Sequence, residues 1–169
     1  MTTTQVHHVF IRATADEIWE AITSPERTSK YFFGTTIEIA PGLRSSRGPG
    51  GEDWGTDAVL EFDPPRRLVH EWKSVYDEEL AAEPASRVTW EITPQEGGTM
   101  CLVTLTHARL EASPKTAADV SGAGWMYVLS SMKTLLETGE GLPRELRRRE
   151  PPRPRRASGA RGRRGIMVG

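Results

Sequence analysis

The chain carries four histidines, the side chains most often used to bind metals and to transfer protons near neutral pH. His7 and His8 are neighbours in a stretch with strand character, so their side chains point to opposite faces. Neither His70 nor His107 lies in a ligand-like cluster, and Cys101 is the only cysteine. We therefore expect no metal site and no cofactor.

Motifs that would indicate an enzyme are also absent from the sequence. It contains no Gly-x-Ser-x-Gly elbow, no phosphate-binding loop and no dinucleotide fingerprint. Asp16 and Glu17 fall in the first turn of a predicted helix, where carboxylates stabilise the helix dipole. We expect no catalytic residues, with an acid–base pair of His70 with Glu71 or Glu61 left open as an alternative.

The charge of the chain is unevenly distributed. Residues 144–169 contain ten arginines and two glutamates, a net charge of +8, so the rest must carry −9 to give the overall −1. We expect a folded domain over residues 1–140 and a disordered arginine-, proline- and glycine-rich tail over 141–169. The tail could attract phosphates, but it lacks the aromatic residues of single-strand binders. Nucleic-acid binding is therefore not expected, and a solvated tail or a sequence artefact remains open.

No apolar run reaches the ~20 residues that a membrane span needs. The first residues show neither the basic region nor the apolar core of a signal peptide. A single cysteine agrees with a reducing compartment. From these features we expect a cytoplasmic location.

Alternating apolar and polar residues predict several strands, with two short helices after the first. Thr14 and Glu17 form a capping-box pattern that predicts the first helix, and Pro25 suits the first turn of the second. A turn is expected at residues 63–65 and a hairpin around 94–98. The predicted strands span residues 6–12, 35–39, 57–62, 67–75, 87–93 and 99–107.

The glycine- and proline-rich residues 40–55 have the composition of a mobile loop or a poorly formed hairpin. Near the end of the domain, a single long helix is expected over about residues 115–137. Its apolar residues fall in one stripe, which an antiparallel sheet must cover. The stripe consists of Trp125, Val128, Leu129, Met132, Leu135 and Leu136.

Four segments, residues 6–11, 15–23, 59–68 and 124–139, resemble bacterial homologues of the activator of heat-shock protein 90 ATPase, in the same order. That family belongs to the START-like (SRPBCC) superfamily, which includes the birch pollen allergen. The resemblance implies an α+β helix-grip fold: a curved antiparallel sheet wrapped around a long C-terminal helix, with a cavity between them. The arginine-rich tail is not part of the family pattern.

On this fold, helix and sheet residues would line the cavity. Trp72 and His70 share one predicted sheet face, and Trp90 shares one face of its own strand with Val88 and Ile92. Phe33 and Trp54 are expected near the entrance. His70, His107 and Tyr127 are candidates for polar groups that orient a ligand. The predicted cavity residues are Phe33, Trp54, His70, Trp72, Trp90, Trp125, Val128, Leu129, Met132 and Leu136.

The expected function is non-enzymatic binding of a small hydrophobic or amphipathic ligand, either lipid-like or planar aromatic. Residues 40–55 are expected to gate entry to the cavity. A role in a stress response is also expected. One alternative is a protein-interaction module, acting like a co-chaperone or paired with a transcriptional regulator, through the outer face of the sheet. A cyclase or hydrolase is the weaker enzymatic alternative.

Overall fold

Seven antiparallel strands form one curved sheet in the computed structural model, which describes residues 4–143 of the chain. The strands are β1 (Gln5–Ile11), β2 (Thr36–Ala40), β3 (Leu43–Arg47), β4 (Asp53–Asp63), β5 (Arg67–Trp72), β6 (Ser86–Pro94) and β7 (Cys101–Ala108). The helices are α1 (Ala15–Thr23), α2 (Pro25–Tyr31), α3 (Glu78–Ala81), α4 (Pro114–Val120) and α5 (Ala123–Thr138).

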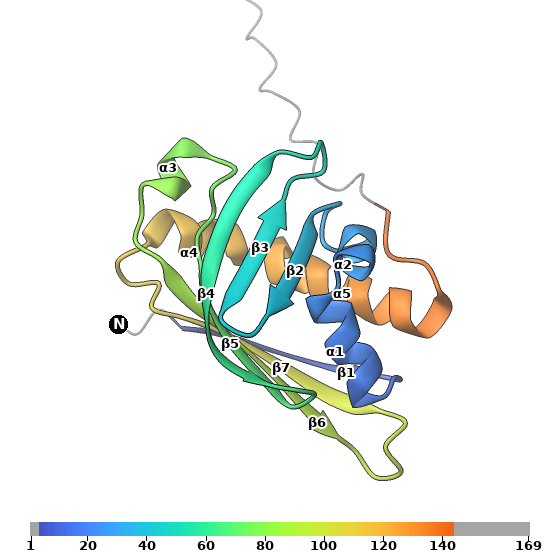
Figure 1. Ribbon diagram of the computed structural model, residues 1–169. Coiled ribbons are helices and arrows are strands. Elements are labelled where there is room, and N and C mark those ends of the chain that lie inside the picture. Colours follow the sequence, from blue (N-terminus) through green and yellow to red (C-terminus); the bar gives the residue numbers. More distant parts are fainter. Residues whose placement is uncertain (1–3, 144–169) are drawn as a thin grey trace, which may run out of the picture.

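The sheet order is β1-β7-β6-β5-β4-β3-β2, so strands that follow each other in sequence are neighbours except at β1. Helices α1 and α2 connect the two edge strands, and α5 crosses the concave side of the sheet (Figure 1). This arrangement is the predicted α+β helix-grip fold. None of the helices within residues 4–143 has both the length and the apolar character needed to cross a membrane.

Strict alternation in β6 and β7 builds the centre of the core. Every second residue of each strand is buried, because successive side chains of a strand point to opposite faces. Trp90 pairs with Leu105 and Ile92 with Val103 on the inner face. Cys101 is also buried there, as expected for a core thiol.

Local hydrogen bonds fix the short helices, and one set of them, the capping box of α1, was predicted from the sequence. In the capping box of α1, the Thr14 hydroxyl accepts from the backbone N–H of Glu17, and the Glu17 carboxylate accepts from the N–H of Thr14. The Tyr31 hydroxyl at the end of α2 donates to the carbonyl of Ala21 at 2.7 Å. The Thr28 hydroxyl accepts from the N–H of Ile37 at 2.8 Å, which ties α2 to β2.

The interpretation of residues 40–55 as a mobile loop or poorly formed hairpin is wrong. β2 and β3 pair along their whole length, and β3 continues the pairing to β4. Gly42, at φ +85°, makes the tight turn between β2 and β3, a conformation that costs glycine little. The sequence of β3 hides its strand character because the inward-facing residues are Arg44 and Ser46, not apolar ones.

The expectation of one helix over residues 115–137 also needs correction. The chain forms two helices, α4 and α5, that are separated at Ser121 and Gly122. Gly122 has φ +60° and ψ −119°, a combination that only glycine adopts without strain. The predicted tail lies outside the described residues, apart from residues 141–143.

Replacing Gly122 by alanine should destabilise the domain by about 1–3 kcal/mol, because alanine is strained at this backbone conformation. A methyl group there would meet no atom within 4 Å, so any loss of stability comes from backbone strain alone. Urea unfolding measures it, with Met126→Ala on the exposed side of α5 as control. Equal stability of Gly122→Ala and the parent protein would contradict the prediction.

Candidate functional site

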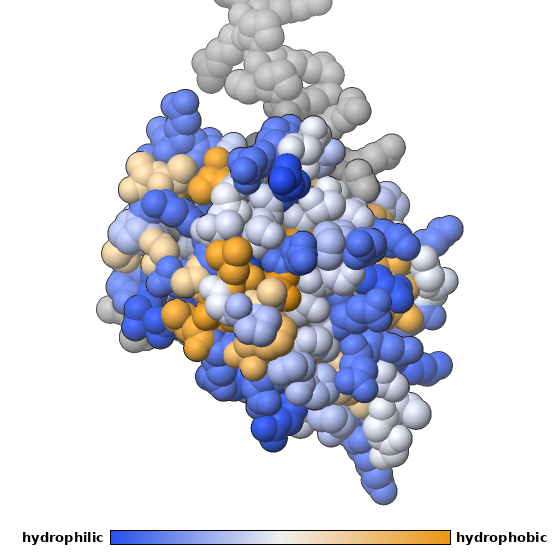
Figure 2. All heavy atoms as spheres, in the orientation of Figure 1, coloured by the Kyte–Doolittle hydropathy of each residue, from blue (hydrophilic) through white to orange (hydrophobic). Residues whose placement is uncertain are grey.

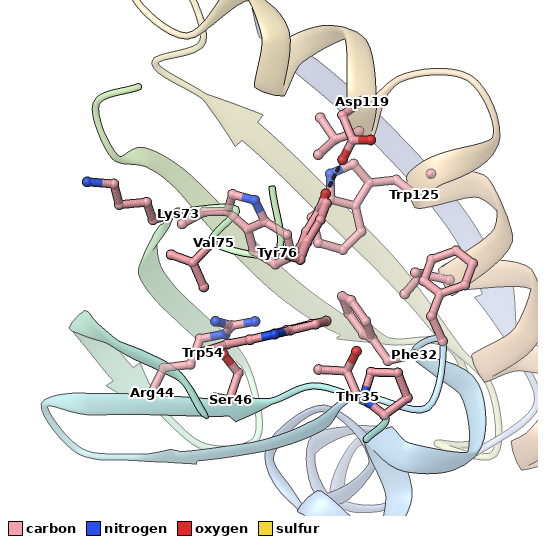
Figure 3. A pocket seen from close by; sticks show the side chains of 16 residues that line it. Phe32, Thr35, Arg44, Ser46, Trp54, Lys73, Val75, Tyr76, Asp119 and Trp125 are labelled. Carbon is pink, nitrogen blue, oxygen red and sulfur yellow. Dashed lines mark hydrogen bonds between the residues drawn. The ribbon is translucent and has the colours of Figure 1, made fainter. Parts of the chain in front are cut away.

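A pocket of about 260 Å³ opens between the concave face of the sheet, the α4–α5 break and the segment after α2. Figure 3 shows its side chains converging from these elements. Most of its surface is apolar. It is lined by Phe32, Phe33, Thr35, Arg44, Ser46, Pro49, Trp54, Trp72, Lys73, Val75, Tyr76, Asp119, Val120, Gly124, Trp125 and Val128.

Three aromatic rings form the inner wall of the pocket. The ring centroids of Trp72 and Trp125 lie 5.2 Å apart, and Phe32 packs edge-on against Trp125 at 5.8 Å. Trp90 supports Trp125 from behind, also edge-on, at 5.9 Å. Such tilted and edge-to-face contacts are the favoured geometry of aromatic pairs, so this wall is held in shape by its own packing.

A buried hydrogen-bonded chain fixes the orientation of Trp125. Its indole N–H donates to Nδ1 of His107 at 3.0 Å, and His107 Nε2 lies 2.7 Å from the Ser86 hydroxyl. Because Nδ1 accepts, the neutral ring carries its proton on Nε2 and donates it to Ser86. Burial lowers the pKa of His107 to about 4, with His7 adding to the effect, so the neutral form dominates near neutral pH.

His70 is neutral for a similar reason. Burial lowers its pKa to about 3, and the Arg44 charge contributes in the same direction. Its Nδ1 donates to the carbonyl of Glu71 at 2.8 Å. Neither this ring nor His107 lines the main pocket, and the two histidines support the wall from behind.

The opposite wall is polar and comes from β3. The Arg44 side chain is only 6% exposed, and its Nη1 donates to the Asp57 carboxylate at 2.7 Å. The guanidinium carbon lies 4.9 Å from the Trp72 ring centroid, in the range of a cation–π contact. Burial lowers the pKa of Arg44, and the Asp57 carboxylate opposes that shift. Burial also raises the pKa of Asp57, against the effect of Arg44.

The outer part of the pocket carries Trp54, Tyr76 and Asp119. Trp54 and Tyr76 pack with ring centroids 5.5 Å apart, and the Tyr76 hydroxyl donates to the Asp119 carboxylate (Figure 3). Gly48 leaves room for Trp54, since a Cβ there would lie 2.7 Å from the indole. The turn before β4 therefore fits directly against the entrance.

Phe33 borders the pocket in an unusual conformation. Its φ is +51°, which is uncommon for a large side chain and costs about 1–3 kcal/mol. Its ring stacks on Tyr127 at 4.5 Å, and the Tyr127 hydroxyl donates to the carbonyls of Leu142 and Pro143. This contact holds the end of the α2 segment against α5.

The predicted cavity residues fall into three groups. Phe33, Trp54, Trp72, Trp125 and Val128 line the pocket. His70 and Trp90 border a second void of only about 10 Å³ behind the aromatic wall. On α5, Leu129 and Met132 are buried in the core and Leu136 packs against it.

Sequence reasoning missed the polar residues of the pocket. Arg44 and Ser46 belong to the segment that was expected to be irregular, Thr35 was expected in a strand but not at the pocket, and Asp119 belongs to a helix that was merged with α5. The one available signal was the alternation of Arg44 and Ser46 in residues 43–47. Within residues 4–143, no cluster of three metal-ligating side chains occurs.

Chemically, the arrangement favours binding. Among the described residues, no histidine or cysteine lines the pocket. Its carboxylate, Asp119, already accepts from Tyr76, and Ser86 faces the proton-bearing nitrogen of His107, which cannot act as a base toward it. The available groups are aromatic faces, the guanidinium of Arg44, the Lys73 ammonium and the hydroxyls of Thr35 and Ser46.

Comparison with known proteins agrees with the fold. The family described as "Activator of Hsp90 ATPase homolog 1-like protein" matches residues 12–137. A comparison with curated proteins gives no match.

Several solved structures are similar to this chain. EF2215 from Enterococcus faecalis, a conserved protein of unknown function, has 16% identity and a TM-score of 0.63 over 85% of this chain and 76% of its own. CalU16 from Micromonospora echinospora has 25% identity and a TM-score of 0.60, over 83% and 77%. DynU16, a protein of the dynemicin biosynthetic locus, has 24% identity and a TM-score of 0.63, over 82% of this chain and 49% of its own.

The two neutral histidines predict that acid destabilises the protein. An unfolded histidine binds a proton near pH 6.5, whereas folded His107 does so only near pH 4. Between these two pH values the unfolded state therefore binds more protons than the folded state, so lowering the pH favours unfolding. The free energy of unfolding should fall as the pH decreases from 6.5 towards 4, by up to about 1.4 kcal/mol per pH unit for each histidine.

Urea unfolding at several pH values between 4 and 7 measures this dependence. In His107→Gln the free energy of unfolding should depend less on pH. His8→Gln, on the exposed face of β1, serves as control. If the His107→Gln protein shows the same pH dependence as the parent, the assignment of a neutral buried His107 is wrong.

Proposed function

This chain belongs to the family of Activator of Hsp90 ATPase homolog 1-like proteins, and from that premise we propose that it binds a small hydrophobic or amphipathic molecule in the aromatic pocket, without catalysing a reaction. The pocket itself supports the proposal best. Small-molecule sites are concave and mostly apolar, with a few polar groups that set orientation, and this pocket combines six aromatic side chains with a polar wall on β3.

The shape of the pocket favours a planar aromatic ligand over a long acyl chain. Its volume of about 260 Å³ is near the lower end of the roughly 300–1,000 Å³ typical of ligand sites. Aromatic faces from Trp54, Trp72 and Phe32 offer stacking surface at little cost in conformational entropy, because the rings are already packed against one another.

A protein-interaction role is a second candidate, and the outer face of the sheet supports it. Apolar side chains gather on this face (Figure 2), where Leu43 and Leu60 are 50% and 49% exposed. Leu43 pairs with exposed Ala58 across β3 and β4. The partner would be a chaperone or a transcriptional regulator. A cytoplasmic location and a role in stress stay predictions.

Filling the pocket should weaken ligand binding. Val128 lines it from α5, so a tryptophan in its place would occupy the ligand volume. We expect Val128→Trp to weaken the binding of planar aromatic compounds by at least about tenfold, equivalent to about 1.4 kcal/mol. Quenching of tryptophan fluorescence, backed by calorimetry, measures the affinity. Met126→Trp, on the exposed side of the same helix, should bind as the parent does. Undiminished binding by a folded Val128→Trp protein would contradict the pocket assignment.

The second candidate makes a different prediction. Replacing Leu43 and Leu60 by lysine should remove a copurifying chaperone or regulator, because the apolar contact surface is lost, and should leave binding of aromatic compounds intact. Native mass spectrometry of the purified variants shows both. If the partner still copurifies with the doubly substituted protein, this face is not the surface that it contacts.

A further inference from the structure

We propose that the pocket selects a planar aromatic carboxylate, whose carboxylate is bound by Arg44 together with the hydroxyls of Ser46 and Thr35. This inference rests on the proposed function, because it specifies the ligand of the same pocket. It is carried by the chemistry of the β3 wall, which an apolar ligand would not need.

Arg44 lines the pocket with part of its guanidinium unpaired. Its Nη1 is paired with Asp57 at 2.7 Å, and within residues 4–143 no hydrogen bond involves its Nε or Nη2. The side chain is almost wholly buried and lines the pocket. A guanidinium matches a carboxylate through two parallel N–H···O bonds, so the edge formed by Nε and Nη2 suits a second carboxylate.

Two hydroxyls lie on the same polar wall. Arg44 and Ser46 share the inward face of β3 by alternation, and Thr35 precedes β2, the strand that pairs with β3. Ser46 is 7% and Thr35 5% exposed, both line the pocket, and neither hydroxyl has a hydrogen-bond partner among the described residues. These polar atoms are open to the space of the pocket and not sealed in the core, so acceptor oxygens of a ligand can bind all three side chains together.

The charges around the pocket favour an anion on this side. Arg44 and Lys73 both line the pocket, whereas the nearby carboxylates of Asp57 and Glu71 do not. The pKa of Asp57 reflects all of these charges: Arg44 and Lys73 oppose the rise caused by burial, and Glu71 adds to it. The remaining carboxylate, Asp119, lies across the pocket with Tyr76 (Figure 3). A ligand carboxylate is therefore directed to Arg44 and away from Asp119.

The aromatic residues explain why the rest of the ligand should be planar. Arg44 lies over the Trp72 ring at 4.9 Å, so a carboxylate bound to its free edge places the attached group beside Trp72. Trp54, on the strand paired with β3, lines the pocket as well. A ring system joined directly to the carboxylate can contact both indoles.

The test compares two probes of nearly equal shape, 2-naphthoate and 2-naphthamide, at pH 7. They differ in charge, and the same tryptophan quenching and calorimetry measure both dissociation constants. The parent protein should bind naphthoate at least about tenfold more tightly than naphthamide, as expected for hydrogen bonds to a charged group.

Three variants locate the origin of this preference. Arg44→Met should lose it, while binding of naphthamide is retained. Arg47→Met, on the outward face of the same strand, should keep it. Asp57→Asn should increase it, because the competing carboxylate is gone while Arg44 remains charged.

The outcomes separate this inference from the proposed function. Failure of the parent protein to bind either probe would overturn both. Equal affinity for the two probes, or a preference that persists in Arg44→Met, would overturn the carboxylate assignment and leave the aromatic pocket in place. If Arg44→Met does not fold, Asp57→Asn decides, and an unchanged preference in that variant would overturn the assignment.

Discussion

The buried indole N–H of Trp125 is the constraint on which the pocket depends. A donor removed from water must find an acceptor or cost the protein about 1–3 kcal/mol, and here the acceptor is Nδ1 of His107. That single bond sets the tautomer of His107, which donates onward to Ser86, and the Ser86 hydroxyl reaches the carbonyl of Trp72. Helix α5 is thereby connected to β7, β6 and β5, and the two tryptophans of the inner wall are held by one chain of hydrogen bonds.

The polar wall differs from the aromatic wall because it holds the charge of Arg44 on an inner face that is mostly apolar. Burying a guanidinium is costly unless it is paired, and Asp57 compensates only one of its nitrogens. The contact with Trp72 links this wall to the aromatic one. Recognition by the pocket therefore combines a rigid apolar surface with a fixed cation, each of which positions the other.

Much of the fold could be predicted from local patterns. The Thr14–Glu17 capping box, the alternation in β6 and β7 and the hairpin between them each act over a few residues, so the sequence alone reveals them. The α4–α5 break was missed because one helix was expected across residues 115–137, whereas Ser121 is extended and Gly122 has φ +60°. The pocket was harder. Trp72 and Trp125 follow from alternation and helical spacing, but the burial of Arg44 depends on Asp57, thirteen residues away, and β3 looks like a surface strand when read without its neighbours.

The pairing of β1 with β7 has a consequence for how the chain folds. His8 and Thr104, hydrogen-bonded across these strands, are separated by 96 residues. During synthesis β1 must therefore wait, with its inward side uncovered, until β7 has been made. Contacts of such long sequence separation slow folding, because the entropy of closing the loop is lost before the contact forms. The β2–β5 meander needs no such delay, so the chain is expected to assemble from its middle outwards, with β1 and α5 added last.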